Sequence, residues 1–277
     1  MSSIKQEVRQ LRNGLLRLEQ AIGRFEKIEE TANPYDLETL LQNIKTLAEK
    51  ADTKTLRESI SSWLNKKHQE KERLKKDFEA KFAYELETAL KDKGFLLKGS
   101  YPTLRTKIFT LKLDFRKQAM TIWYGPEQEC MGKERLDPKR IARKIESIYN
   151  GLSKRTFDER QFLEKVYNAY QRLLRWKGWQ QGVKVPIVDV LGELAFLMQG
   201  TDFRINPSRD RYRSYSRAHF SYDLYRLSQR SYKDRALELE MATMAMSKSR
   251  ANYLWIPDNE EGDGHIYSSL SFREVKP

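Results

Sequence analysis

The chain has 277 residues, a formal net charge of +13 at pH 7 and a charged fraction of 33%. Its aromatic content of 11% excludes general disorder, because disordered chains are poor in aromatic residues. The apolar fraction of 39% is low for a globular domain, which predicts long helices with one solvated side. No run of residues reaches the roughly 18 apolar positions of a membrane span, so we expect no membrane helix.

The beginning of the sequence predicts a cytoplasmic or other reducing intracellular location. Met1 to Lys5 lead directly into an amphipathic pattern and not into the apolar block of a signal peptide. A single cysteine, Cys130, cannot form a disulfide within the chain.

Residues 1–92 show helical periodicity from the start. Apolar residues follow one another in steps of four and three, the heptad pattern of a coiled coil: Ile4, Val8, Leu11, Leu15, Leu18, Ile22 and Phe25. This helix either packs on a neighbouring helix of the same chain or pairs with another chain. The next helix begins at Asn33-Pro34, a capping residue followed by a proline that suits the first turn. We predict an N-terminal long-helix bundle or coiled coil, with Leu11, Leu15, Leu18 and Ile22 as candidates for binding a partner or a second copy.

Residues 93–277 have a different pattern and predict a helical domain with β-hairpins. Phe109–Phe115 and Met120–Tyr124 alternate apolar and polar residues, which indicates a hairpin within 104–124, with a possible third strand at 95–97. A second hairpin is expected near 253–270. The apolar helix 187–198 is expected at the centre of a second core. The predicted fold class is therefore mainly α with small β elements, an α+β protein.

Three segments of this second region are harder to assign. We interpret 201–217 as a loop and the alternation of Ala218, Phe220, Tyr222 and Leu224 as a strand. Residues 234–249 predict a helix, and the hairpin that follows it gives the element order of a winged helix.

Arginine and tyrosine alternate in one segment, which is the strongest candidate for nucleic-acid binding. Arginine guanidinium groups match phosphate oxygens, and tyrosine rings stack on unpaired bases. The segment contains Arg204, Arg209, Arg211, Tyr212, Arg213, Tyr215 and Arg217. In an extended conformation, Arg209, Arg211 and Arg213 would lie on one side. The alternative interpretation is a solvated loop whose arginines pair with nearby acidic helices.

Other basic and aromatic segments are weaker candidates. Lys139, Arg140, Arg143 and Lys144 follow Pro138 at helical spacing, so they share one face that can follow a phosphate backbone. The lysine-rich stretch 66–76 is interspersed with acidic residues, and we interpret it as a solvated helix face whose charges pair internally. Trp176 and Trp179 are suited to base stacking, although we interpret these residues at a helix end as part of the core.

We find no complete catalytic or metal-binding motif in the sequence. Asp114, Glu127, Glu129 and Lys133 form an incomplete metal-nuclease set, because the following strand lacks Glu-x-Lys. The segment from Gly125 to Lys133 has the wrong spacing for a phosphate loop. One cysteine and three scattered histidines do not give zinc-ligand spacing. The acidic turn 258–263 does not match an EF-hand, so we expect neither a metal nor a cofactor.

These patterns together predict a non-enzymatic nucleic-acid-binding subunit of a larger assembly. Its partners would be DNA or RNA, and a protein or a second copy at the N-terminal helices, with no membrane. The alternatives are a scaffold or adaptor for an acidic protein partner, and a divergent metal-dependent nuclease.

Overall fold

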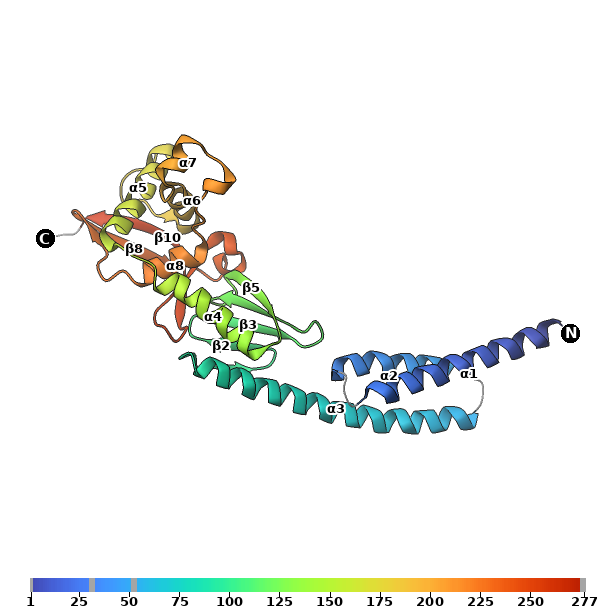
Figure 1. Cartoon of the computed structure of the whole chain (residues 1–277). Helices are drawn as coiled ribbons and strands as arrows, with labels where there is room; N and C mark the ends of the chain where they lie inside the picture. The colour runs from blue at the N-terminus through green and yellow to red at the C-terminus, as the bar shows by residue number, and fades with distance from the viewer. Residues whose placement is uncertain (1, 30–32, 51–53, 275–277) are drawn as a thin grey trace. The chain divides into compact units, whose positions relative to one another are not determined.

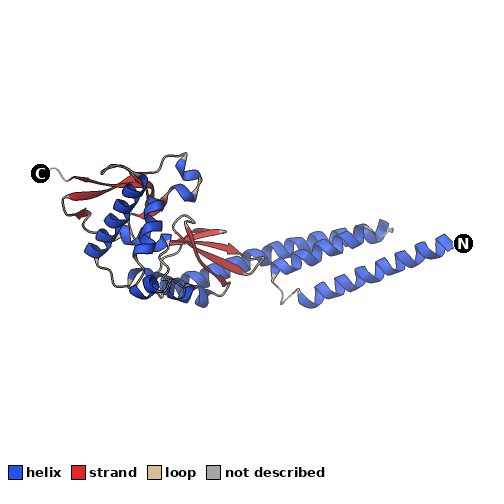
Figure 2. Ribbon diagram, turned by 90° about the horizontal axis from the view of Figure 1, so that it is seen from above, coloured by secondary structure: helices blue, strands red, loops and turns tan. Residues whose placement is uncertain are grey.

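The computed structural model describes residues 2–29, 33–50 and 54–274, except for the side chains of residues 2–5, 7, 54–57 and 59. These residues form a mixed α+β protein made of two compact units (Figures 1 and 2). One unit contains residues 1–88 and 115–118, and the other contains residues 89–114 and 119–277. The boundary at residue 88 lies inside a helix, whereas the sequence-based boundary at residue 92 follows the end of that helix.

Long helices build the first unit: α1 (Ser2–Ile28), α2 (Pro34–Glu49) and the part of α3 (Lys54–Lys91) that ends at Thr88. They run side by side and enclose an apolar core (Figure 1). As predicted, Asn33 caps α2, because its side chain accepts a hydrogen bond from the Tyr35 backbone N–H at 3.0 Å.

The apolar seam of α1 divides into a buried and an exposed half. Leu18 and Phe25 are only 3% and 2% exposed and belong to the core shared with α2 and α3, so packing within the chain is confirmed for this half. Val8 and Leu11 are 59% and 38% exposed. The N-terminal end of α1 extends past α2 and α3 in Figure 1. Ile4 lies outside the described side chains.

The lysine-rich stretch of α3 pairs within itself in part, as predicted, but it also pairs with other segments and is not solvated throughout. Lys67 forms ion pairs with Glu29 at 2.8 Å and with Glu70 at 3.0 Å, and its hydrogen bonds to these carboxylates raise the pKa of Lys67. Lys71 is buried and contacts Glu38 of α2 at 3.7 Å. These lysines therefore connect α3 to the other helices of the first unit.

The first sheet of the second unit is an antiparallel meander. Its strands follow one another in chain order: β1 (Lys98–Ser100), β2 (Thr103–Thr106), β3 (Phe109–Asp114), β4 (Ala119–Tyr124) and β5 (Glu129–Arg135). The predicted hairpin is confirmed, with Phe109 opposite Tyr124. Residues 95–97 are not a strand. Strand β5 was not predicted, because its residues are mostly polar and show no clean alternation.

A second sheet and several helices complete this unit. The strands are β6 (Val185–Pro186), β7 (Ser231–Tyr232), β8 (Arg235–Met241), β9 (Leu254–Pro257) and β10 (Gly264–Glu274). The helices are α4 (Pro138–Ser153), α5 (Glu159–Lys177), α6 (Ile187–Leu197), α7 (Thr201–Ile205) and α8 (Arg217–Tyr225), with short 3₁₀ turns η1 (Arg209–Arg211), η2 (Met246–Lys248) and η3 (Arg250–Asn252). The β9–β10 pairing confirms the second predicted hairpin.

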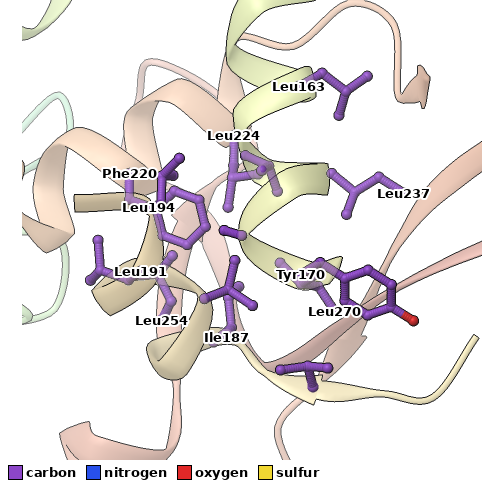
Figure 3. Close-up of a cluster of buried hydrophobic side chains, with 14 of the residues drawn as sticks. Leu163, Tyr170, Ile187, Leu191, Leu194, Phe220, Leu224, Leu237, Leu254 and Leu270 are labelled. Atoms are coloured by element: carbon purple, nitrogen blue, oxygen red, sulfur yellow. The ribbon is translucent and has the colours of Figure 1, made fainter. Parts of the chain in front are cut away.

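The core of the second unit is centred on α6, as predicted. Side chains from α5, α6, α8, β8, β9 and β10 converge there, among them Tyr170, Ile187, Leu194, Phe220 and Leu270 (Figure 3). Ile187, Val190 and Leu194 of α6 have no exposed surface.

Three segment assignments were wrong. Residues 218–224 belong to helix α8, and every one of them except His219 is buried. Because this short helix is enclosed on all sides, its sequence lacks the apolar periodicity that distinguishes a helix from a strand. Residues 235–241 are strand β8 and not a helix, because pairing with β10 overrides their helix propensity. No winged-helix order is therefore formed. The expected loop 201–217 contains α7 and η1.

Candidate nucleic-acid interface

Helix α4 exposes a basic face because its apolar positions are turned inward. The Asp137 carboxylate caps the helix by accepting a hydrogen bond from the Arg140 backbone N–H at 2.9 Å, and Pro138 occupies the first turn. The buried positions are Ile141, Ala142, Ile145 and Leu152. The exposed positions between them include Lys139, Arg140, Arg143 and Lys144.

Strand β5 adds basic side chains at the edge of the first sheet. Lys133 lies opposite Thr121 and Arg135 lies opposite Ala119, so both project from the face that carries Thr121. The residue between them, Glu134, projects from the other face, because side chains alternate along a strand. Both Lys133 and Arg135 are exposed.

Two contacts join β5 to α4. Glu134 forms an ion pair with Arg140 at 3.1 Å. The stem of Lys144 lies over Gly132 of β5, where an added Cβ atom would come within 3.5 Å of Lys144 Cε. Gly132 and Glu134 share one face of β5, so α4 packs on that face, whereas Lys133 and Arg135 project from the other face of the same edge strand.

We define the β5–α4 surface as Lys133, Arg135, Lys139, Arg140, Arg143 and Lys144. Among the residues that the structure describes, Arg140 alone of these six forms an ion pair with a carboxylate. The other five positive charges are exposed and uncompensated, which makes this surface attractive to a polyanion.

The arginine-rich segment forms a closed loop held at its base by Gln199. This buried side chain accepts a hydrogen bond from the Arg213 backbone N–H at 2.9 Å and donates to the Arg213 carbonyl at 3.0 Å. Arg204, Arg209, Arg211 and Arg213 are all exposed. Because 209–211 is a 3₁₀ turn, the expected row of three arginines along an extended strand does not form.

Tyr215 and Arg217 are structural residues, contrary to our interpretation of the sequence. Tyr215 is 8% exposed and donates a hydrogen bond to the Asp223 carboxylate at 2.7 Å. Burial and the neighbouring carboxylate raise the pKa of Tyr215. Arg217 donates to the Tyr253 carbonyl, and burial lowers its pKa. Tyr212, which is 46% exposed, remains available to a ligand.

A buried charge cluster at α8 supports this loop, and sequence reasoning missed it. Asp223 is 1% exposed and forms ion pairs with Arg155 and, at 2.8 Å, with Arg226. His219 contacts Ser216 at 2.9 Å, and burial lowers its pKa, assisted by the charge of Arg155. The only signal in the sequence was an aspartate inside an otherwise apolar run.

The candidate partner-binding residues of α1 do not all face outward. Leu18 is in the core, and Ile22 packs against the same core. Leu15 is half-buried, and Leu11 is exposed. Leu18 is therefore unavailable to a partner, because its surface is already covered by the chain itself, whereas Ile22 is only partly covered.

The two tryptophans at the end of α5 are exposed, contrary to the expectation that they belong to the core. Trp176 and Trp179 are 79% and 39% exposed. The helix ends at Gly178, whose left-handed φ of 66° turns the chain and leaves both indole rings outside.

The geometry does not assemble the alternative metal sites. Phe109 at the start of β3 is in register with Tyr124, and Tyr124 is in register with Glu129. Asp114 lies at the other end of β3, so the sheet separates it from Glu129. Glu127 pairs with Lys112 at 2.7 Å. No group of three potential metal ligands occurs among the described residues.

The acidic turn between β9 and β10 directs its carboxylates to separate partners. Glu260 accepts hydrogen bonds from Tyr149 at 2.7 Å and from Tyr222 at 2.8 Å. Burial, followed by this hydrogen bond, raises the pKa of Tyr149 to about 12. Asp258 pairs with His265 at 2.6 Å. The turn therefore attaches the β9–β10 hairpin to α4 and α8.

No described helix combines the length and apolar character needed to cross a bilayer. Comparisons with protein-family models, curated protein sequences and solved structures gave no match to this chain.

Proposed function

We propose that this protein binds nucleic acid, DNA or RNA, and that the β5–α4 surface contacts the phosphates. The observation that carries the proposal is the set of five exposed basic side chains without an ion-pair partner in the described structure. Internal ion pairs elsewhere, such as those of Lys67, show that this chain neutralises lysines that serve its fold. Charges left uncompensated on two packed elements fit an external polyanion.

The spacing of the basic residues supports contact with a backbone. Lys139 and Arg143 are four residues apart on α4, as are Arg140 and Lys144, so each pair lies one helical turn apart on the exposed face. Lys133 and Arg135 add two positive charges on the opposite face of the edge strand β5. Contacts of this kind fix the position of a nucleic acid without reading its sequence. The exposed arginines of the 204–213 segment would add further phosphate contacts.

The experiment is a salt series of fluorescence-anisotropy binding to DNA and RNA oligonucleotides. We expect the triple variant Lys133→Gln, Arg143→Gln, Lys144→Gln to bind more weakly and to have a shallower dependence of log K on log salt. The slope should fall by about 0.7–0.9 for each phosphate that the variant no longer neutralises. In the matched control, three exposed lysines of the first unit are replaced by Gln in the same way: Lys45, Lys76 and Lys81. This control should bind as the wild type does.

Two results would contradict the proposal. One is the absence of wild-type binding to any oligonucleotide at about 50 mM salt, where phosphate contacts are strong. The other is an equal reduction of binding in the triple variant and in its control, which would indicate a general charge effect and no defined surface.

A second function, protein docking by α1, is favoured by the exposed half of the seam. Val8 and Leu11 continue the apolar stripe towards the N-terminus and are exposed, in contrast to the buried Leu18 and Phe25. We propose that this half forms a coiled coil with a second copy, or that the chain acts as an adaptor for another protein. Replacing Val8 and Leu11 by Glu should convert a wild-type dimer to a monomer of 32.9 kDa in light scattering. A wild-type protein that is already monomeric would reject self-pairing.

A further inference from the structure

Three large aromatic rings of the second unit are exposed on α5, on α6 and in the loop that follows η1. Trp176 on α5 is 79% exposed, Phe196 on α6 is 50% exposed, and Tyr212 after η1 is 46% exposed. Most other large aromatic side chains of this unit are buried, as Tyr124, Phe109 and Phe272 are. Exposed rings of this size are costly in water unless a ligand covers them.

Arginines lie between these rings and link them. Arg172 is one helical turn before Trp176, and its guanidinium group lies 5.6 Å from the centre of the Phe196 ring. Arg204 donates a hydrogen bond to the carbonyl of Leu197, the residue after Phe196, at 3.2 Å. We define the aromatic strip as Trp176, Arg172, Phe196, Arg204, Arg211 and Tyr212.

The far end of the aromatic strip is held by the loop itself. The Tyr212 ring contacts Phe203, which precedes Arg204, with 5.7 Å between ring centres. Arg211 donates to the Asp202 carbonyl at 3.4 Å. Rings and guanidinium groups therefore alternate from the end of α5 to η1.

Ordered elements present these side chains. Leu173 and Leu174, the α5 residues that follow Arg172, are buried in the core. Lys177 pairs with Asp189 of α6 at 2.8 Å, and Gln199 fixes the base of the 204–213 loop. Because these supports are already formed, a ligand would not have to order the rings on binding.

The alternation of rings and cations fits unpaired bases and their phosphates. A base in a duplex is stacked and paired, whereas an unpaired base offers its flat face to an aromatic side chain. Guanidinium groups between the rings match the phosphates between successive bases. The same alternation disfavours the apolar face of a protein partner, because that face would have to desolvate the arginines.

Carboxylates near the aromatic strip limit its electrostatic attraction. Glu193 forms an ion pair with Arg172 at 2.9 Å, and Asp202 and Asp210 lie within the loop. Stacking, and not charge, should therefore supply most of the binding at this strip. This separates it from the β5–α4 surface, where charge is uncompensated.

We propose that the nucleic acid bound by this protein is single-stranded and that its bases stack on Trp176, Phe196 and Tyr212. This inference rests on the proposed nucleic-acid-binding function and names its substrate class. It predicts that loss of a ring weakens binding to unpaired bases without changing the salt slope.

The test compares three probes: a thymidine oligonucleotide of about 20 nucleotides, a strand of equal length made of abasic sites, and a duplex of equal length. The abasic strand keeps the phosphates and lacks the bases. The variants are Trp176→Ala and Tyr212→Ala. The control is Tyr84→Ala, which removes a ring that is 72% exposed in the first unit.

We expect Trp176→Ala and Tyr212→Ala each to weaken binding of the thymidine strand by about fivefold or more, the loss of one base–aromatic stack. Binding of the abasic strand and of the duplex should stay within about twofold of wild type, as should all binding by Tyr84→Ala. Unchanged melting temperatures would show that the variants are folded.

Equal loss for the thymidine and abasic strands, or no loss for either, would overturn the stacking proposal. If the lysine and arginine variants of the β5–α4 surface still weaken binding in that case, the proposed function stands and the substrate class is wrong. If the wild type binds none of these probes and none of the RNA oligonucleotides at about 50 mM salt, the proposed function fails as well.

Discussion

Asp223 is a buried carboxylate whose charge is balanced by two arginines. It is 1% exposed, and Arg155 and Arg226 contact it together with the Tyr215 hydroxyl. Asp223→Asn would leave both guanidinium groups without their counter-charge. We expect the free energy of unfolding, measured with urea, to fall by about 3–5 kcal/mol.

The control for Asp223→Asn is Asp234→Asn, at a side chain that is 72% exposed. Surface substitutions of this kind usually stay within about 0.5 kcal/mol. A similar loss in both variants would show that the buried cluster does not stabilise the fold.

His219 makes stability depend on pH in a direction set by its burial. Burial and the charge of Arg155 lower the pKa of His219 from its ordinary value of 6.5. The unfolded chain therefore takes up this proton at a higher pH than the folded chain. The stability is fully present above the unfolded pKa and is lost as the pH falls towards the folded pKa.

We expect the unfolding free energy of His219→Gln to fall less than that of wild type between about pH 7 and about pH 5, because Gln takes up no proton there. The measurement is urea denaturation of both proteins across this range. Parallel pH profiles would mean that the neutral histidine contributes nothing to stability.

At the scale of elements, two glycines should respond to alanine with opposite signs. Gly125 follows β4 with a positive φ of 58°, and a Cβ atom there would overlap the indole ring of Trp255 on β9. Gly151 lies inside α4, where an added Cβ atom meets nothing within 4 Å.

We expect Gly125→Ala to lower the free energy of unfolding by more than about 1 kcal/mol, because the backbone conformation and the close approach both disfavour alanine. Gly151→Ala should raise it by about 0.5–1 kcal/mol through helix propensity. Thermal denaturation of the two variants checks the pair, and a stabilising Gly125→Ala would disprove the close packing of β4 on β9.

Strand β8 shows how one element is decided by another. Its sequence, with alanine, leucine, glutamate and methionine, predicts a helix. In the structure, Leu237 lies opposite Phe272 and Leu239 opposite Leu270, so β10 supplies the pairing and the apolar cover. The alternation of Leu237 and Leu239 with Glu238 and Glu240 was the correct signal, but it is short and agrees with a helix as well.

At the scale of the whole molecule, the positive charge divides between surfaces that share no secondary-structure element. Losses of binding free energy at sites that share no partners add. We consider the case in which both the β5–α4 surface and the 204–213 loop bind the nucleic acid. A variant that combines the β5–α4 triple substitution with Arg209→Ala, Arg211→Ala and Arg213→Ala should then lose binding free energy equal to the sum of the two separate losses. Anisotropy measurements that show no further reduction in the combined variant would restrict phosphate binding to one surface.

Elements with local signals were predictable from the amino-acid sequence. Heptad spacing and the Asn33-Pro34 cap gave the N-terminal helices, and alternation on either side of Arg116-Lys117 gave the β3–β4 hairpin. These features depend on residues a few positions apart, and so their periods and caps are visible in the chain. The basic face of α4 followed from the same kind of local spacing.

The availability of the candidate side chains to a ligand depends on the packing of the folded chain. Tyr215 and Arg217 are residue types that bind nucleic acid, yet Tyr215 is hydrogen-bonded to Asp223 and Arg217 to the Tyr253 carbonyl. Trp176 is a residue type expected in the core, yet it is 79% exposed. The physical reason is that burial and ion pairing depend on neighbours far away in the sequence. The basic residues of the candidate interface were therefore predictable from the sequence. Which of them are exposed is known only from the packing of α8, β5 and α5.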